Sequence, residues 1–167
     1  MSTPSAQELI SKLGLRKHPI ENGFMSEVTY VSSRSITLKD DRTIPLADTV
    51  HFLYEKGQFS PWHRMRTSDE LWVHQAGGTL TIYIFDERMM EKCIQVKRLE
   101  PCGLVKILAG CWFAVEMDPQ LGDYCLSTVL LCPGFDINDF EMADRNLLKS
   151  QMKNESDREL AGKFFNA

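Results

Sequence analysis

Residues 57–77 read GQFSPWHRMRTSDELWVHQAG and place a histidine, a methionine and a glutamate on strand-like sequence between two glycines. In a β-strand, residues two apart share a face, so His63 and Met65 point the same way. After a short turn, the returning strand carries three side chains on one face: Glu70, Trp72 and His74. Because buried polar groups need partners, we expect His63 and Glu70 to lie on neighbouring strands and to pair with each other.

The sequence around this hairpin predicts a protein made mainly of strands. From residue 24 to about residue 135, short runs rich in β-branched and aromatic residues alternate with glycine, proline and aspartate turns. Such runs without helical patterns between them indicate an antiparallel sandwich or barrel. The run TLTIYIF (79–85) is apolar on both faces. We expect one face to line the interior and the other to be covered by a second sheet or a partner subunit.

Helices are expected only at the two ends of the chain. Ser5 and Glu8 form a capping box that opens a helix over residues 5–14. Residues 138–149 and 155–165 show helical apolar spacing with many charges and are predicted to be surface helices. No repeat or linker interrupts the chain, so residues 1–167 are predicted to form one domain with a barrel core at about 24–135.

The composition argues against several classes of partner. The 167 residues carry 19 Lys and Arg against 23 Asp and Glu, which gives no positive field to attract nucleic acid or an acidic membrane. We find no apolar run near the length of a membrane span and no secretory signal at the N-terminus. The 5 cysteines contain no C-x-x-C pair and are typical of reduced thiols. These features predict a soluble cytoplasmic protein.

The spacing within residues 57–77 resembles the first motif of the cupin superfamily, G-x5-H-x-H-x3,4-E-x6-G. Gly57, His63, Glu70 and Gly77 match it, and Met65 stands where the second histidine would be. The second cupin motif matches only in part, and Phe113 occupies the position of its metal-binding histidine. The resemblance implies a double-stranded β-helix, or jelly-roll, barrel.

Further stretches resemble the "cupin-five" branch of small single-domain proteins. They are His18-Pro19, Phe59–Met65, Asp69–Trp72, Ala76–Gly78 and Pro133–Glu141. The resemblance covers residues 7 to 148 and implies a barrel that forms homodimers, related in fold to the sugar-nucleotide epimerases of the rhamnose pathway. Members of the branch often carry a histidine at the position of Gln75, whereas here the histidine is His74, on the opposite strand face.

The ligand set argues against a tight metal centre, although a divalent ion stays possible. A stable site needs three or more suitable ligands, and His63 and Glu70 supply two. Met65 offers a soft thioether, and His74 could be a third ligand only if it points inward. We therefore predict no cofactor and keep a divalent-metal enzyme as the third hypothesis.

Two other functions suit the predicted interior. The first is binding of a small polar organic ligand, possibly sugar- or nucleotide-like, centred on His63 and Glu70. The expected ligand-binding residues around that centre are Phe24, Glu27, Tyr30, Trp62, Arg64, Trp72, His74 and Trp112. The second is metal-independent isomerase or epimerase chemistry, as the resemblance implies, with His63 as general base, Glu70 in support and a tyrosine as acid. The candidate acids are Tyr30, Tyr83 and Tyr124.

Overall fold

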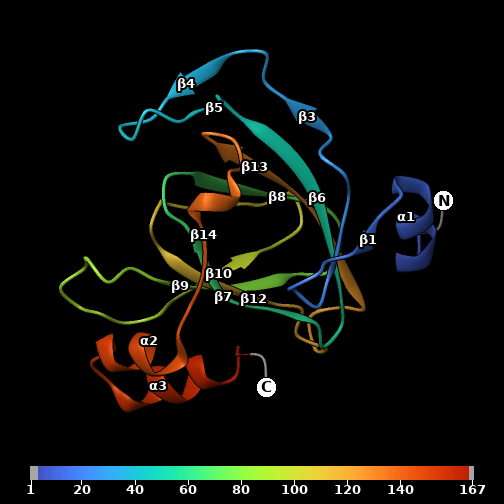
Figure 1. The fold of residues 1–167 in the computed structure, drawn as a ribbon. Coiled ribbons are helices and arrows are strands. Elements are labelled where there is room, and N and C mark those ends of the chain that lie inside the picture. Colours follow the sequence, from blue (N-terminus) through green and yellow to red (C-terminus); the bar gives the residue numbers. More distant parts are fainter. Residues whose placement is uncertain (1–3, 166–167) are drawn as a thin grey trace.

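The computed structural model describes residues 4–165, which form a barrel of two antiparallel sheets that face each other (Figure 1). The first sheet has seven strands, in the order β1-β2-β6-β13-β8-β11, with β3 paired to β6. Their bounds are β1 (Arg16–Lys17), β2 (Phe24–Met25), β3 (Tyr30–Val31), β6 (Asp48–Glu55), β8 (Asp69–Gly77), β11 (Leu104–Ile107) and β13 (Tyr124–Cys132). The predicted all-β class is confirmed.

The second sheet has five strands, in the order β10-β9-β12-β7-β14. Their bounds are β7 (Phe59–Met65), β9 (Leu80–Phe85), β10 (Gln95–Leu99), β12 (Trp112–Glu116) and β14 (Phe140–Met142). A separate hairpin joins β4 (Ser35–Thr37) to β5 (Thr43–Pro45). Thus β7 and β8, which are consecutive in the chain, belong to different sheets. The expectation that His63 and Glu70 lie on neighbouring strands is therefore wrong, because the connection between them crosses from one sheet to the other.

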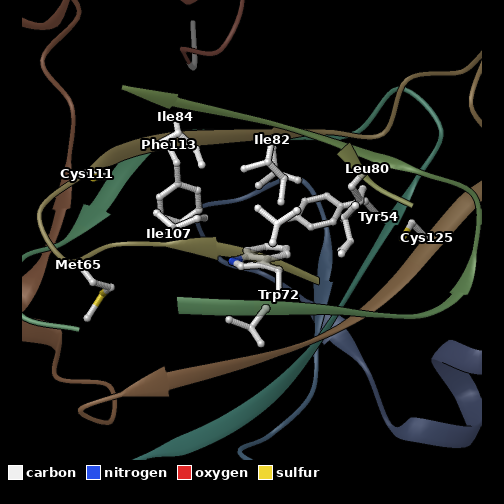
Figure 2. Packing of buried hydrophobic residues seen from close by; sticks show 14 of the residues in the cluster. Tyr54, Met65, Trp72, Leu80, Ile82, Ile84, Ile107, Cys111, Phe113 and Cys125 are labelled. Atoms are coloured by element: carbon white, nitrogen blue, oxygen red, sulfur yellow. The ribbon is translucent and has the colours of Figure 1, made fainter. Parts of the chain in front are cut away.

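The space between the sheets holds the main apolar core. Figure 2 shows Trp72, Phe113, Ile82 and Leu80 packed together in the barrel interior, and all four are almost fully buried. Gly77 ends β8 with a φ of 91°, and a Cβ there would lie 2.2 Å from the carbonyl oxygen of Tyr124. The close approach of β13 thus explains this glycine of the first motif.

The outer face of the five-stranded sheet is covered by the C-terminal helices α2 (Arg145–Gln151) and α3 (Glu155–Gly162) (Figure 1). The indole Nε1 of Trp62 donates to the carbonyl oxygen of Ala161 at 3.0 Å, and Phe164 packs on Trp62 and Tyr83. Helices of the same chain therefore cover the outward face of residues 79–85. The expectation that a second sheet or a partner subunit covers this face is wrong.

The N-terminal helix agrees with its prediction. Helix α1 spans Ala6–Leu13, with Ser5 as N-cap and Gly14 as C-cap. The Ser5 hydroxyl accepts from the Glu8 backbone N–H, and the Glu8 carboxylate accepts from the Ser5 backbone N–H at 2.7 Å. Leu9 of this helix packs with Leu53 of β6 on the outside of the seven-stranded sheet.

The predicted helix over residues 138–149 is wrong in its first half. Residues Ile137–Asp139 form a 3₁₀ turn, η1, and β14 then extends the five-stranded sheet at its β7 edge. Helix α2 begins only after Asp144, which caps it. One of the charged residues in this segment binds neighbouring groups instead of lying on a surface helix: Asp139 is 1% exposed and accepts from Arg42 and Thr67. The helix predicted at 155–165 is confirmed as α3 and ends earlier, at Gly162.

Among residues 4–165, no helix has the length and apolar composition needed to cross a membrane.

Candidate functional site in the barrel cavity

A cavity of about 240 Å³ lies where the N-terminal segment, the seven-stranded sheet and β7 meet. Most of its wall is apolar or aromatic and includes Met25, Val50, Phe52, Trp72, Val129, Leu131 and Phe140. Five polar side chains also face it: His18, Glu21, Asp48, His63 and Glu70. An apolar cavity with a few convergent polar groups is the usual form of a small-molecule site.

His63 lies on the β7 side of the cavity and is held in one orientation. Its Nδ1 is 2.7 Å from the carbonyl oxygen of Pro61 and 3.1 Å from the hydroxyl of Ser60. Because a carbonyl oxygen can only accept, Nδ1 carries the proton of the neutral ring. The other nitrogen, Nε2, lies 4.0 Å from Oε1 of Glu21 and presents a lone pair to the cavity.

Glu21 lies at the centre of the polar side chains that face the cavity. It accepts a hydrogen bond from the hydroxyl of Tyr54, and its Oε1 lies 3.8 Å from Nε2 of His18. Nδ1 of His18 accepts from the backbone N–H of Glu21 at 2.9 Å, so Nε2 carries the proton of neutral His18. Burial lowers the pKa of His18, although the nearby carboxylate of Glu21 opposes this and nearby His63 adds to it. Neutral His18 therefore offers an N–H donor to this part of the cavity.

Glu70 faces His63 from the opposite sheet and has a different partner from the one predicted. The indole Nε1 of Trp72 donates to Oε2 of Glu70 at 3.0 Å. Burial raises the pKa of Glu70 to about 8; the Trp72 hydrogen bond opposes this shift, and the carboxylates of Glu21 and Asp48 add to it. Glu70 consequently keeps its proton at neutral pH. Burial also raises the pKa of Asp48, which accepts from the backbone N–H of Phe135.

Three of the predicted site residues line the cavity, namely His63, Glu70 and Trp72. Three others, Trp62, Arg64 and Trp112, lie on the outer face of the five-stranded sheet. The guanidinium of Arg64 stacks over the Trp112 ring at 4.1 Å and pairs with Glu141 at 2.7 Å. The strand alternation explains this outcome, because residues adjacent to His63 and Phe113 must point away from the interior.

The remaining predicted residues also lie elsewhere. Phe24 packs in the outer cluster beside helix α1, while its neighbour Met25 lines the cavity. Glu27 pairs with Arg16 on the surface, and Tyr30 is 55% exposed. His74 lies outside the cavity wall, with Nε2 3.0 Å from the carbonyl oxygen of Gly78.

None of the three tyrosines predicted as acids lines the cavity. Tyr30 is exposed, the Tyr83 hydroxyl donates to Glu116 at 2.9 Å, and the Tyr124 hydroxyl donates to the carbonyl oxygen of Pro4. Tyr54, which the sequence interpretation missed, is fully buried and binds Glu21 at the cavity. Burial is the main cause that raises the pKa of Tyr54 well above its ordinary value.

Sequence reasoning also missed His18, Glu21, Asp48 and Phe52 as lining residues. Alternation along β6 could have found Asp48 and Phe52, because Asp48, Val50, Phe52 and Tyr54 share the inward face. His18 and Glu21 occupy an irregular segment between β1 and β2, where no periodicity fixes the direction of a side chain.

The cavity does not fit the metal-binding set of the cupin motifs. Within residues 4–165, no group of three or more His, Cys, Asp or Glu side chains is arranged to hold a metal ion. Phe113 pairs with His63 in register across β12 and β7, and its ring centroid lies 4.1 Å from that of His63. A phenyl ring thus occupies the place beside His63 where the second motif would supply a ligand.

The two facing sheets and their cavity define a jelly-roll protein of the cupin type. Residues 7–143 match the family Cupin_5, described as Cupin superfamily (DUF985), and the chain belongs to this family. A comparison with curated protein sequences gives no match.

Solved structures show the same fold. A hypothetical protein from Leishmania major shares 22% identity at a TM-score of 0.81, covering 98% of this chain and 100% of that one. A protein from Shewanella oneidensis shares 26% identity at a TM-score of 0.79, covering 99% of each chain. The Streptomyces protein Pac13, described as a nucleoside dehydratase, is more distant, with 11% identity, a TM-score of 0.52, and 77% of this chain and 84% of that one covered.

Proposed function

We propose that this protein binds a small polar organic molecule in the barrel cavity, with a polar group of the ligand at His63, Glu21 and Glu70. One observation carries the proposal: His63 is 4% exposed, yet its Nε2 has no hydrogen-bond partner within the described chain and faces the cavity. A ligand donor at this position would form a hydrogen bond inside a mostly apolar cavity and would thereby stabilise the folded protein.

The aromatic wall supports binding of the rest of the ligand. Phe52 and Trp72 stack with ring centroids 5.6 Å apart, and Phe140 lies near His63 on the β7 side. Burying an apolar ligand body against these rings is favourable, whereas the polar groups fix its orientation.

A thermal-shift screen of small polar metabolites tests the proposal. A ligand present at one hundred times its Kd should stabilise the protein by about 2.7 kcal/mol and raise its Tm. The His63→Gln variant should lose at least tenfold in affinity. The His51→Gln variant is the matched control, because His51 points outward from β6 and binds Thr128 at 2.9 Å. Equal loss of affinity in both variants, or none in either, would place the ligand elsewhere.

Metal-independent isomerisation or elimination is a second candidate function. The lone pair on Nε2 of His63 can accept a proton from a bound substrate, and protonated Glu70 faces it across the cavity as a proton donor. These roles replace the tyrosine acid of the sequence interpretation. The dehydratase Pac13 has the same type of fold at 11% identity, which supports a search for elimination reactions as well as epimerisation.

Solvent-exchange NMR tests this second function. Carbonyl sugars and nucleosides incubated in D₂O should take up deuterium, or lose water, only when His63 is present. The His63→Gln variant should slow exchange by about 10² or more, the usual contribution of a general base. Exchange that continues unchanged in the variant would contradict the role of His63 as a base.

A further inference from the structure

The side chains around the cavity include acids and no permanent cation. Of the polar residues that face it, three are carboxylic acids, Glu21, Asp48 and Glu70, and each is 6% exposed or less. Within the described part of the chain, neither lysine nor arginine contributes to the wall. A phosphate or carboxylate entering this cavity would thus meet like charge and find no cationic side chain to bind it.

The free hydrogen-bonding positions include the Nε2–H donor of His18 and the proton of Glu70, and the remaining ones are acceptors. Nε2 of His63 is an acceptor because the proton of the neutral ring lies on Nδ1. Glu21 and Asp48 each have one carboxylate oxygen bound, by the Tyr54 hydroxyl and the Phe135 N–H, which leaves Oε1 of Glu21 and Oδ1 of Asp48 as further acceptors. The histidine is an independent sign of a ligand, since it is 4% exposed and directs an unpaired nitrogen into the cavity. A complementary ligand must consequently supply several donors.

The aromatic wall favours the same kind of ligand. The rings of Phe52, Trp72 and Phe140 line the cavity, and Phe52 also stacks on Tyr54 with centroids 6.2 Å apart. The faces of aromatic rings attract cations, and this attraction is strongest where water is excluded. Carboxylates combined with aromatic faces form a common environment for an organic ammonium group.

We propose that the ligand is a small organic cation, an amine or related nitrogen base, whose N–H groups bind the acceptors of Glu21 and His63 and whose charge displaces the proton of Glu70, while its apolar body packs on Phe52 and Trp72. This inference rests on the proposed function and specifies its ligand class. An ammonium group has only donors and a positive charge, so it satisfies both requirements of the cavity. A phosphate group satisfies neither requirement, because it is anionic and offers mainly acceptor oxygens.

The electrostatics of Glu70 support this assignment. Burial raises its pKa to about 8, and the carboxylates of Glu21 and Asp48 contribute to the shift. Burial is the larger cause, and the neighbouring carboxyl groups add to it because negative charge nearby disfavours ionisation of Glu70. A bound cation would lower the pKa of Glu70 and favour its ionised form, which could then pair with the cation.

Three ligands of similar size test the charge class: benzylamine, benzyl alcohol and benzoate. The readout is the indole N–H resonance of Trp72, because this group donates to Glu70 at the cavity wall. It can be assigned among the 3 tryptophans from its loss in the Trp72→Phe variant. We expect benzylamine to shift this resonance with at least tenfold higher affinity than benzyl alcohol, and benzoate to have no effect.

The Glu70→Gln variant removes the group that a bound cation would ionise and preserves the shape of the site. Glutamine retains an oxygen that can accept from the Trp72 indole, so the wall is preserved while the acid is removed. The preference for benzylamine over benzyl alcohol should fall at least threefold in this variant. It should be unchanged in the Glu116→Gln control, whose side chain binds Tyr83 away from the cavity.

The outcomes separate this inference from the proposed function. Benzyl alcohol or benzoate binding as tightly as benzylamine would overturn the cationic class while supporting a small-molecule site. A preference that persists in Glu70→Gln would overturn the role of Glu70. No shift with any of the three, combined with a failed metabolite screen, would overturn both proposals.

Discussion

Glu70 is held in the cavity with an indole N–H as its hydrogen-bond donor and two other carboxyl groups nearby. Its pKa is raised from 4.5 to about 8, so the folded state binds this proton more tightly than the unfolded state. At a pH between these two pKa values, Glu70 is ionised in the unfolded protein and protonated in the folded protein. The contribution of Glu70 to stability therefore decreases as pH rises through this window.

We predict that Glu70→Gln removes this pH dependence. In wild type, Glu70 should reduce the free energy of unfolding by up to about 1.4 kcal/mol per pH unit between pH 4.5 and 8. Urea denaturation of both proteins at pH 5, 6, 7 and 8 measures the difference. The variant should become progressively more stable relative to wild type as pH rises, and parallel pH profiles would contradict the raised pKa.

Tyr54 supplies the hydroxyl that binds Glu21, and both side chains are buried. We predict that Tyr54→Phe destabilises the protein by about 1–3 kcal/mol, because it leaves a buried carboxylate oxygen without its donor. Urea denaturation measures the loss. The variant should also weaken ligand binding, since Glu21 would lose the contact that positions it.

Tyr83→Phe is the matched control for this prediction. Its hydroxyl also donates to a carboxylate, that of the half-buried Glu116, and this pair lies away from the cavity. Water can replace the lost donor there, so the cost should be below about 1 kcal/mol. An equal loss of stability in Tyr83→Phe and Tyr54→Phe would show that the burial of Glu21 does not determine the cost of removing the hydroxyl.

At the level of elements, the C-terminal helices α2 and α3 stabilise the outer face of the five-stranded sheet. Phe164 is 2% exposed and contacts Phe59, Trp62 and Tyr83. We predict that Phe164→Ala reduces the free energy of unfolding by about 3–5 kcal/mol, the usual cost of removing a buried phenyl ring. Chemical denaturation measures this change.

The same substitution should leave the cavity intact, because none of these contacts lines it. The Trp72 indole resonance should therefore keep its position in folded Phe164→Ala. Phe165→Ala is a milder control, since Phe165 is only partly buried and lies under the guanidinium of Arg145. A displaced Trp72 resonance would mean that the helices and the cavity are coupled.

Local signals predicted most elements well. The capping box at Ser5 fixes the start of α1, and strand alternation predicts which side of β7 faces inward. Helical apolar spacing with many charges was misleading at residues 138–143, because charged residues occur on surface helices and also serve as buried ion-pair partners. Asp139 has the second role here, with Arg42 at 2.9 Å. That contact spans 97 residues, so no local pattern could reveal it.

At the scale of the whole molecule, the site forms where distant segments meet. His63, Glu70 and Trp72 could be identified from the motif spacing, since the barrel frame fixes the direction of each strand residue. His18 and Glu21 could not, because the position of their irregular segment depends on tertiary packing such as that of Gly23 against Tyr54. The expected homodimer and the cytoplasmic location stay predictions.

The barrel frame also explains why two residues separate this chain from the metal-binding cupin pattern. Met65 and Phe113 both belong to the interior cluster, and Phe113 lies directly opposite His63. We predict that the double variant Met65→His, Phe113→His gains a divalent-metal site, with three histidines near Glu70. Because imidazole and carboxylate suit Co²⁺ and Zn²⁺, metal at one hundred times its Kd should stabilise the folded variant by about 2.7 kcal/mol.

Thermal unfolding with and without Co²⁺, together with the visible absorption of the bound ion, measures this gain. The single variant Phe113→His is the control for the number of ligands, and it should bind Co²⁺ at least tenfold more weakly than the double variant. Circular dichroism must first show that each variant keeps its strand content, because both replaced side chains are buried. A folded double variant that Co²⁺ does not stabilise would show that Glu70, bound to the Trp72 indole, cannot turn toward an ion beside His63. In that case the absence of a metal site would have two causes: the residues at positions 65 and 113, and the way the seven-stranded sheet holds Glu70.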